Sequence, residues 1–166
     1  DLHWHLDLIG GGELRGRLET LASDLGIADR VTFRGALPQP AIIGALREAD
    51  LFVLPTKPAT GGDRDGLPNV LMEAASQELP ILATAFAGTP EFLEDGVHGV
   101  LVPPGAPDAL AEALRALAGD PALRRRLGRA ARWRLVQDFS EDAGIALIAA
   151  SLSACTTPLP DREAVA

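Results

Sequence analysis

The chain contains Asp65-Gly66-Leu67-Pro68-Asn69-Val70-Leu71-Met72-Glu73-Ala74, a stretch in which two carboxylates flank a helix start. Pro68 suits the first turn of a helix, because its missing N–H would have no partner there. A helix that begins near Pro68 places Glu73 about 7 Å further along the axis. Asp65 then lies in the loop at the mouth of this helix.

The backbone of this helix start is expected to bind an anion. The N–H groups of Gly66, Leu67 and Asn69 point out of the helix, where its dipole favours negative charge. A solvated Glu73 on a capped helix is the plain alternative. Its apolar neighbours instead favour a partly exposed carboxylate that needs a polar partner. Together these groups offer donors to a phosphate and acceptors to sugar hydroxyls, as a nucleotide-sugar site needs.

Composition limits the classes of protein to consider. The chain has 166 residues with 47% hydrophobic residues, enough for one domain with a substantial core. Its net charge of -8 argues against a nucleic-acid partner.

Cys155 is the only cysteine, so neither an intrachain disulfide nor a cysteine-based metal site is expected, which fits the cytoplasm. No apolar run approaches the length of a membrane span, about 20 residues. Because the chain starts without Met just before an apolar strand, we expect a piece of a longer protein.

Short apolar runs alternate with helical patterns along the chain. Strands are expected at residues 4–9, 31–33, 51–54, 80–84 and 100–102, and helices up to about residue 25, from 40 to 49, from 68, from 107 to 119, from 121 and from 140. The first helix carries Leu14, Leu18, Leu21 and Leu25 on one face. This order predicts an α/β fold with a three-layer α/β/α, Rossmann-like parallel sheet over residues 1–155, followed by a loose tail at 156–166. Ligands bind such sheets at the edge where the strands end, and the loop 55–65 lies there.

Further segments carry a resemblance to a known family. They are Leu8-Ile9-Gly10-Gly11-Gly12, Val31-Thr32-Phe33-Arg34-Gly35, Gly88-Thr89-Pro90-Glu91, Asp95-Gly96-Val97-His98-Gly99-Val100-Leu101-Val102 and Phe139-Ser140. With the acid-Gly-x-Pro…Glu-Ala stretch, and in this order, the chain resembles the retaining glycosyltransferases of family 4. The resemblance is to their C-terminal, donor-binding domain of the GT-B fold and covers roughly residues 4–152.

The resemblance implies a role for each matched residue. Glu73 would hold the ribose hydroxyls of a nucleotide diphosphate sugar, and Asp65 would face the donor sugar. The amides of Gly66 and Leu67 would reach the sugar or the diphosphate, and Arg34-Gly35-Ala36-Leu37 would pass near the nucleobase. These residues would position the donor while the leaving diphosphate accepts the proton of the acceptor. No nucleophile, cofactor or metal is implied, and the acceptor would bind an N-terminal domain of the same enzyme.

The chain also departs from the family pattern. Asp65 stands where the family has Glu, and Ala87 replaces the first glycine of Gly-Gly-x-Pro-Glu. Glu78 occupies the usual helix-ending glycine and would be strained in a left-handed conformation. The first strand and helix of the family domain, and the Arg and Lys that clamp the diphosphate, are not matched. Arg15 and Arg17 are interpreted as solvated helix charges.

Several alternatives remain beside donor binding for transfer. Asp63-Arg64-Asp65 could bind a divalent metal, as in GT-A enzymes, although the helix start makes a metal unnecessary. The Arg-rich helix at 124–134 could favour an anionic membrane surface, with an acceptor there, instead of being a solvated face. A GT-B epimerase and a non-catalytic interaction domain stay open. A dinucleotide fingerprint is incomplete, because Arg15 stands at its third glycine.

Overall fold

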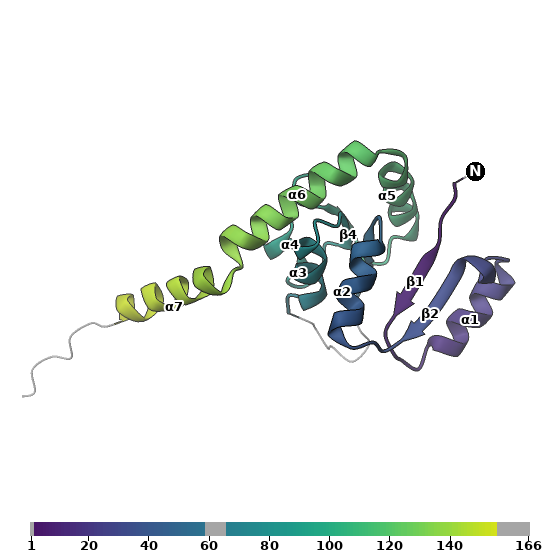
Figure 1. Ribbon diagram of the computed structural model, residues 1–166, viewed down its shortest axis with the longest axis horizontal. Coiled ribbons are helices and arrows are strands. Elements are labelled where there is room, and N and C mark those ends of the chain that lie inside the picture. Colours follow the sequence, from purple (N-terminus) through teal and green to yellow (C-terminus); the bar gives the residue numbers. More distant parts are fainter. Residues whose placement is uncertain (1, 59–65, 156–166) are drawn as a thin grey trace, which may run out of the picture.

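The structure, a computed structural model, describes residues 2–58 and 66–155. Figure 1 shows an α/β arrangement in which every strand pair is parallel. The elements are β1 (Leu6–Ile9), α1 (Arg15–Asp24), the 3₁₀ helix η1 (Ala28–Arg30), β2 (Val31–Gly35), α2 (Gln39–Glu48), β3 (Phe52–Leu54), α3 (Asn69–Ser76), β4 (Ile81–Thr84), α4 (Thr89–Phe92), β5 (Val100–Val102), α5 (Pro107–Gly119), α6 (Pro121–Asp138) and α7 (Glu141–Cys155).

The three-layer arrangement follows from alternation along the central strands. Ile81 and Ala83 of β4 face a cluster that includes Leu46 of α2, Leu71 of α3 and Ala131 of α6. The intervening Leu82 faces the opposite cluster, which α5 and the first half of α6 supply through Leu117 and Leu127. Because successive side chains of a strand point to opposite faces, helices must cover both faces of β3–β4–β5. The predicted α/β/α layers are therefore confirmed.

The predicted helix boundaries agree with the structure to within a few residues. Helix α5 begins at Pro107 and ends at Gly119, as expected from the sequence. The side chain of Asp120 caps α6 by accepting a hydrogen bond from the N–H of Leu123 at 2.9 Å. Ser140 caps α7 through the N–H of Ala143 at 3.2 Å. The short helix α4 is an addition, because the sequence analysis predicts no helix there.

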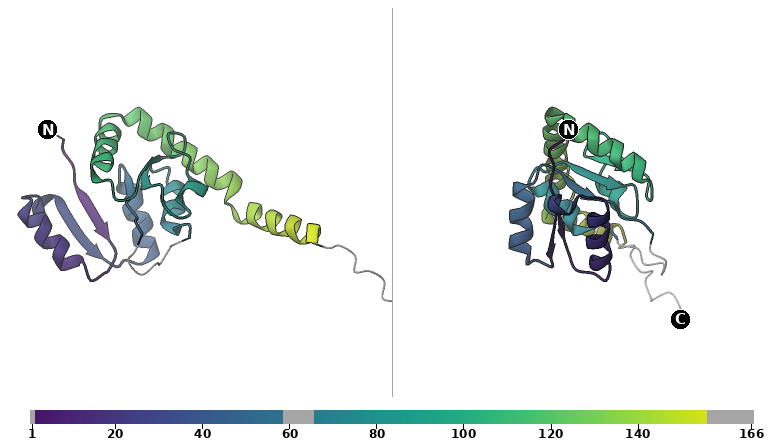
Figure 2. Two further views of the ribbon diagram at one scale, coloured as in Figure 1. Left: turned by 180° about the vertical axis from the view of Figure 1, so that it is seen from behind. Right: turned by 90° about the vertical axis from the view of Figure 1, so that its right-hand side faces the viewer.

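The strands form two parallel ladders, whereas the sequence analysis expected one sheet. Strands β1 and β2 pair with each other, and β4 pairs with β3 and β5. Among the residues that the structure describes, no ladder joins the two groups. Figures 1 and 2 show β1, β2 and α1 together at one side of the molecule.

The four leucines on one face of the first helix are exposed in the structure. The exposed fractions are 61% for Leu14, 40% for Leu18, 50% for Leu21 and 63% for Leu25. Ala22 is the buried residue of the helix, so α1 contacts the rest of the protein beside its leucine face. None of the elements in the described part of the chain covers these four side chains.

Helix α7 leaves the body of the protein and exposes its apolar side chains. Ile145, Leu147, Ile148 and Leu152 are each 58–70% exposed. Figures 1 and 2 show the helix projecting beyond α6. In residues 2–58 and 66–155, no helix combines the length and apolar character needed to cross a membrane.

Among the described residues, two other than glycine adopt positive φ angles, and both stand where the resembled family has glycine. Glu78 has φ 56° and Ala87 has φ 51°. Glu78 therefore has the left-handed conformation in which the sequence analysis expects strain. A side chain with a Cβ is disfavoured there, because Cβ approaches the following carbonyl oxygen.

We predict that Ala87→Gly stabilises the protein by about 0.5–1 kcal/mol. Relief of the left-handed strain, about 1–2 kcal/mol, outweighs the greater freedom of glycine in the unfolded chain, about 0.4–1 kcal/mol. Chemical denaturation monitored by circular dichroism measures the change in unfolding free energy. Ala116→Gly is the matched control. This exposed residue lies within α5, where the same change should lower the unfolding free energy by about 0.5–1 kcal/mol. Destabilisation by both variants would contradict the strain at Ala87.

Candidate functional site

The predicted base-contacting segment lies where β2 ends. Gly35 closes β2 with a φ of 68°, and its carbonyl oxygen accepts a hydrogen bond from the N–H of Gly10 at 2.9 Å. Leu37 follows as a half-buried residue just before α2. The glycine loop after β1 and the turn after β2 are therefore joined at one edge of the parallel ladder.

The mouth of α3 has the open backbone that the sequence predicts. Gly66 and Leu67 form a bend, Pro68 precedes the helix, and Asn69 is its first residue. No side chain among the described residues caps this end, and Leu71 N–H bonds to Pro68 O at 3.0 Å. The earlier N–H groups of a helix have no partner within it and can bind an anion. Asp65, like Asp63 and Arg64, lies outside the described residues.

The turn after β4 supports this helix mouth by direct backbone contact. The N–H of Gly88 bonds to Gly66 O at 3.3 Å. A Cβ at Gly88 would lie 2.8 Å from Leu67 N, so glycine permits this approach. Thr84 fixes the preceding loop as well, because its hydroxyl donates to the Thr56 carbonyl oxygen at 2.6 Å. These hydrogen bonds thus connect the segment between β3 and α3 with the end of β4 and the turn that follows it.

Glu73 lies half-buried on α3 and has the polar partner that its apolar neighbours implied. Gln39 Nε2 donates a hydrogen bond to Glu73 Oε1 at 3.0 Å. Gln39 is the first residue of α2, four positions after Gly35. This contact brings the predicted base segment and the predicted ribose carboxylate to the same edge. The sequence analysis missed Gln39, although a polar residue between two prolines just after a strand could have marked it.

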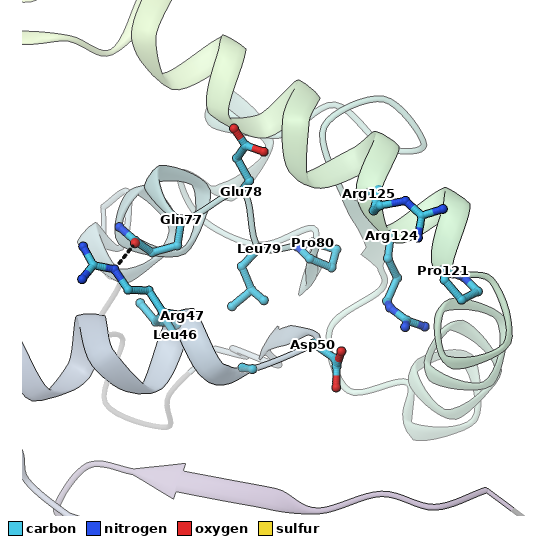
Figure 3. A pocket seen from close by; sticks show the side chains of 11 residues that line it. Leu46, Arg47, Asp50, Gln77, Glu78, Leu79, Pro80, Pro121, Arg124 and Arg125 are labelled. Carbon is cyan, nitrogen blue, oxygen red and sulfur yellow. Dashed lines mark hydrogen bonds between the residues drawn. The ribbon is translucent and has the colours of Figure 1, made fainter.

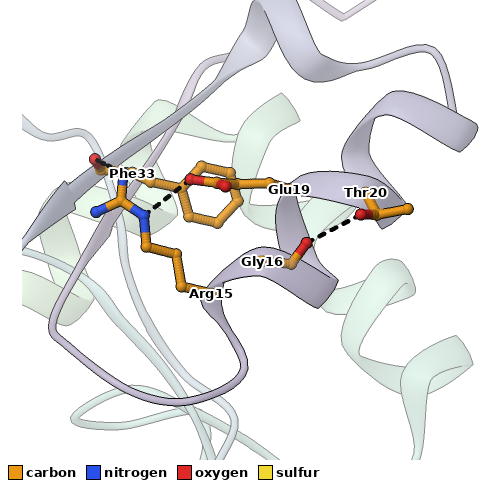
Figure 4. Close-up of polar contacts among 5 residues, drawn as sticks. All are labelled: Arg15, Gly16, Glu19, Thr20 and Phe33. Carbon is orange, nitrogen blue, oxygen red and sulfur yellow. Dashed lines mark hydrogen bonds and ion pairs between the residues drawn. The ribbon is translucent and has the colours of Figure 1, made fainter.

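Arg15 is a half-exposed helix charge, as the sequence analysis expected, and its side chain also reaches the end of β2. Its Nε donates to Glu19 Oε1 at 2.8 Å, and its guanidinium lies 5.9 Å from the centre of the Phe33 ring (Figure 4). One guanidinium nitrogen would be 3.7 Å from a Cβ built at Gly35. The start of α1 therefore places a cation beside the predicted base segment.

Among the described residues, this edge carries the open start of α3, the Glu73 carboxylate and the Arg15 guanidinium, which is paired with Glu19. This set can bind a phosphate through N–H donors and hydroxyl groups through the carboxylate. Within residues 2–58 and 66–155, no group of three or more His, Cys, Asp or Glu side chains is placed to hold a metal ion.

A pocket lies at the opposite edge, where β3 and β4 begin. Asp50 and Pro80 line it from the segments before these strands, and Arg124 lines it from α6 (Figure 3). Arg47 donates to Gln77 Oε1 at 2.8 Å beside it. None of the described site residues predicted from the sequence lines this pocket. Because the parallel-sheet rule and the residue contacts agree on the other edge, the candidate site is assigned there.

The layers of the fold and the loops at this edge define the C-terminal half of a GT-B glycosyltransferase. The chain belongs to the family described as glycosyl transferases group 1, which it matches over residues 1–134. The amylovoran biosynthesis glycosyltransferase AmsK of Erwinia amylovora is 37% identical over 134 residues, 81% of this chain and 33% of that protein.

The chain is also similar to two proteins whose names or titles state a donor or an acceptor. The GDP-mannose-dependent alpha-(1-6)-phosphatidylinositol monomannoside mannosyltransferase of Mycolicibacterium smegmatis is 34% identical over 132 residues, 78% of this chain and 35% of that protein. The crystal structure of Anabaena HepE in complex with UDP-glucose has a TM-score of 0.77 and 26% identity, over 90% of this chain and 41% of that chain. The chain spans about a third of the length of these curated relatives.

We predict that Gly88→Ala loosens the helix mouth and lowers the unfolding free energy by about 1–3 kcal/mol, as overpacking does. The new methyl group would collide with the backbone of Leu67, which flexible side chains cannot relieve. Hydrogen exchange should report faster opening at the start of α3. Gly44→Ala is the control, because a Cβ there meets nothing within 4 Å. The unfolding free energy of this control should be unchanged or rise by up to about 1 kcal/mol, because alanine favours a helix. Equal changes in the two variants would contradict the close contact between Gly88 and the backbone of Leu67.

Proposed function

We propose that residues 1–155 form the nucleotide-sugar-binding domain of a retaining glycosyltransferase of the hexosyltransferase type. One observation carries the proposal: the open start of α3 and the half-buried carboxylate of Glu73 lie at the same edge as the turn after β2. A nucleotide diphosphate sugar presents phosphates, a ribose diol and a base, and this edge offers a complement to each. The UDP-glucose complex of HepE supports this class of ligand.

Each predicted residue has a role in this proposal that suits its chemistry. Glu73 accepts hydrogen bonds from the ribose hydroxyls, since a carboxylate can accept two from a vicinal diol. The amides of the helix mouth bind the diphosphate or the sugar, and the turn after β2 contacts the base. Asp65 faces the donor sugar. The proposed substrate-binding residues are Gly35, Leu37, Asp65, Gly66, Leu67, Asn69 and Glu73.

Transfer in this scheme depends on positioning and electrostatic stabilisation of the donor. The acceptor attacks the face from which the diphosphate leaves, and the diphosphate oxygen accepts the acceptor's proton. Asp65 and Glu73 hold and stabilise the donor without attacking it. The acceptor binds an N-terminal domain of the same enzyme, so this chain alone is expected to bind donors weakly and to show no transfer. An epimerised nucleotide sugar formed from donor alone would instead support the epimerase alternative.

We predict that Glu73→Ala weakens binding of the donor by about 1.5–3 kcal/mol, as for a lost hydrogen bond to a charged group. Calorimetry with UDP-glucose and GDP-mannose measures this change on the 166-residue chain. Glu112→Ala, an exposed acid on α5, is the control and should bind like the unchanged chain. Equal affinity of Glu73→Ala would remove Glu73 from the site. No binding of either nucleotide sugar by the unchanged chain would favour the interaction-domain alternative.

We further propose that the acceptor lies at an anionic membrane surface and that the protein is cytoplasmic and membrane-peripheral. The outward face of α6 exposes Arg125, Arg126 and Arg129 with no acid among them. Within the described part of the chain, none of the three forms an ion pair. Trp133 on the same face is 61% exposed, and tryptophan favours the headgroup region. The phosphatidylinositol-based acceptor in the name of one relative supports this proposal.

We predict that Arg125→Gln/Arg129→Gln weakens binding to vesicles containing phosphatidylglycerol about 30-fold, from about 1 kcal/mol for each arginine near the surface. Co-sedimentation measures the bound fraction, and added salt should reduce it. Arg17→Gln/Arg115→Gln removes the same charge from α1 and α5 and should leave binding unchanged. Binding that is equally strong to uncharged phosphatidylcholine vesicles, or equally weakened by both variants, would contradict this surface.

A further inference from the structure

The contact between Gln39 and Glu73 joins two residues that are 34 positions apart in the chain. The neutral amide of Gln39 donates to one oxygen of the Glu73 carboxylate at 3.0 Å. A carboxylate has about four acceptor positions on its two oxygens. The contact therefore fixes one oxygen and leaves the other with its full accepting capacity.

Two prolines restrict the backbone around Gln39 and so limit the positions from which its side chain can donate to Glu73. Pro38 precedes Gln39 with a φ of -68°, and Pro40 follows it within the first turn of α2. A proline ring fixes its own φ and limits the residue before it. Gln39 is thus held at the start of α2, whereas a residue in a free loop would sample many positions.

A second hydrogen bond connects helix α2 with the end of helix α3, further along both helices. Arg47 Nε donates to Gln77 Oε1 at 2.8 Å, eight positions after Gln39 on α2 and four positions after Glu73 on α3. Packing of Leu46 against Leu71 in the shared core accompanies these bonds. The pair Arg47–Gln77 therefore holds the two helices together without touching Glu73, which makes it an internal reference for a purely structural contact.

We propose that Gln39 is a positioning residue that orients Glu73 for recognition of the ribose. This inference rests on the proposed function, because it takes Glu73 as the group that accepts the ribose hydroxyls. A glutamate side chain has three rotatable bonds, and an unrestrained carboxylate would lose that freedom only when the ligand binds. With Oε1 held by Gln39, the carboxylate is preorganised and Oε2 faces the diol.

The position of Gln39 also couples two parts of the donor. Gln39 follows Gly35 and Leu37, the proposed neighbours of the base, within the same short segment. Because the prolines hold this segment in place, the turn that contacts the base also sets the position of the amide that holds Glu73. Recognition of the base and of the ribose is therefore linked through four residues of backbone, and the preference for ribose over deoxyribose depends on Gln39.

The experiment compares the affinity for UDP and GDP with that for their 2′-deoxy and 3′-deoxy analogues. Gln39→Leu keeps the size of the side chain and removes the donor. We expect it to weaken binding of the ribonucleotide about 3- to 10-fold, the range for the net contribution of a typical hydrogen bond, while binding of at least one deoxy analogue changes little. Gln39→Lys restores a donor and should restore much of the preference. Gln77→Leu breaks the other tie between the helices and should leave the preference intact.

Each outcome either supports or overturns the inference. Equal loss for ribonucleotides and both deoxy analogues in Gln39→Leu, or the same change in Gln77→Leu, would show a structural role only. No change in Gln39→Leu while Glu73→Ala loses the ribose preference would reject Gln39 and keep the proposed function. If Glu73→Ala itself has no effect, the proposed function fails and the inference fails with it.

Discussion

Burial of β4 on both faces is the constraint on which the rest of the structure depends. All four of its residues are buried, with Ile81, Leu82 and Ala83 at 0% exposure. A strand in this position must be covered by helices on both sides, so α3 and α6 pack on one face and α5 with the start of α6 on the other. The coverage requires close backbone approach: a Cβ at Gly128 of α6 would lie 1.9 Å from Glu78 O. Helix α6 can cross the start of β4 only because this position is glycine.

The same packing places the candidate site. Once α3 is fixed against β4, its first N–H groups face the edge where the strands end, and the turn at Gly88 holds them there. Helix α2 packs beside α3, which carries the turn after β2 to the side of Glu73. The site is thus a consequence of three strand–helix connections that end at one edge. Its polar groups come from loops and helix starts, where the backbone has free donors, while the buried core supplies the rigidity.

The sequence predicted the helices and strands well because the residues that mark their ends act locally. Pro107, Gly119 and the pair Asp120-Pro121 mark helix ends through backbone chemistry that acts within a few residues. Long-range contacts carry no such local signal, so the bond from Gln39 to Glu73 and the placement of Arg15 beside Gly35 were missed. The leucine face of α1 shows another limit of local patterns: periodicity correctly indicated a helix, but the spacing of apolar residues does not say which element, if any, covers them. The roles of Gly35, Leu37 and Glu73 came from the family resemblance, and the contacts among their segments are what the structure adds.

The departures from the family pattern bear on whether the site is degenerate. Ala87 and Glu78 retain left-handed φ angles although glycine has been lost at both positions. A residue that holds a disfavoured conformation must be held by its surroundings. At Ala87 those surroundings are the contact of Gly88 with Gly66 and the bond from Thr89 N–H to Phe86 O at 3.2 Å. At Glu78 they include the close approach of Gly128, and the carboxylate lies 3.6 Å from Arg132 Nε. Packing therefore maintains the loop geometry around the candidate site at two positions where a residue other than glycine holds a left-handed conformation. The two residues are a cost in stability and are not in themselves evidence that the candidate site is degenerate.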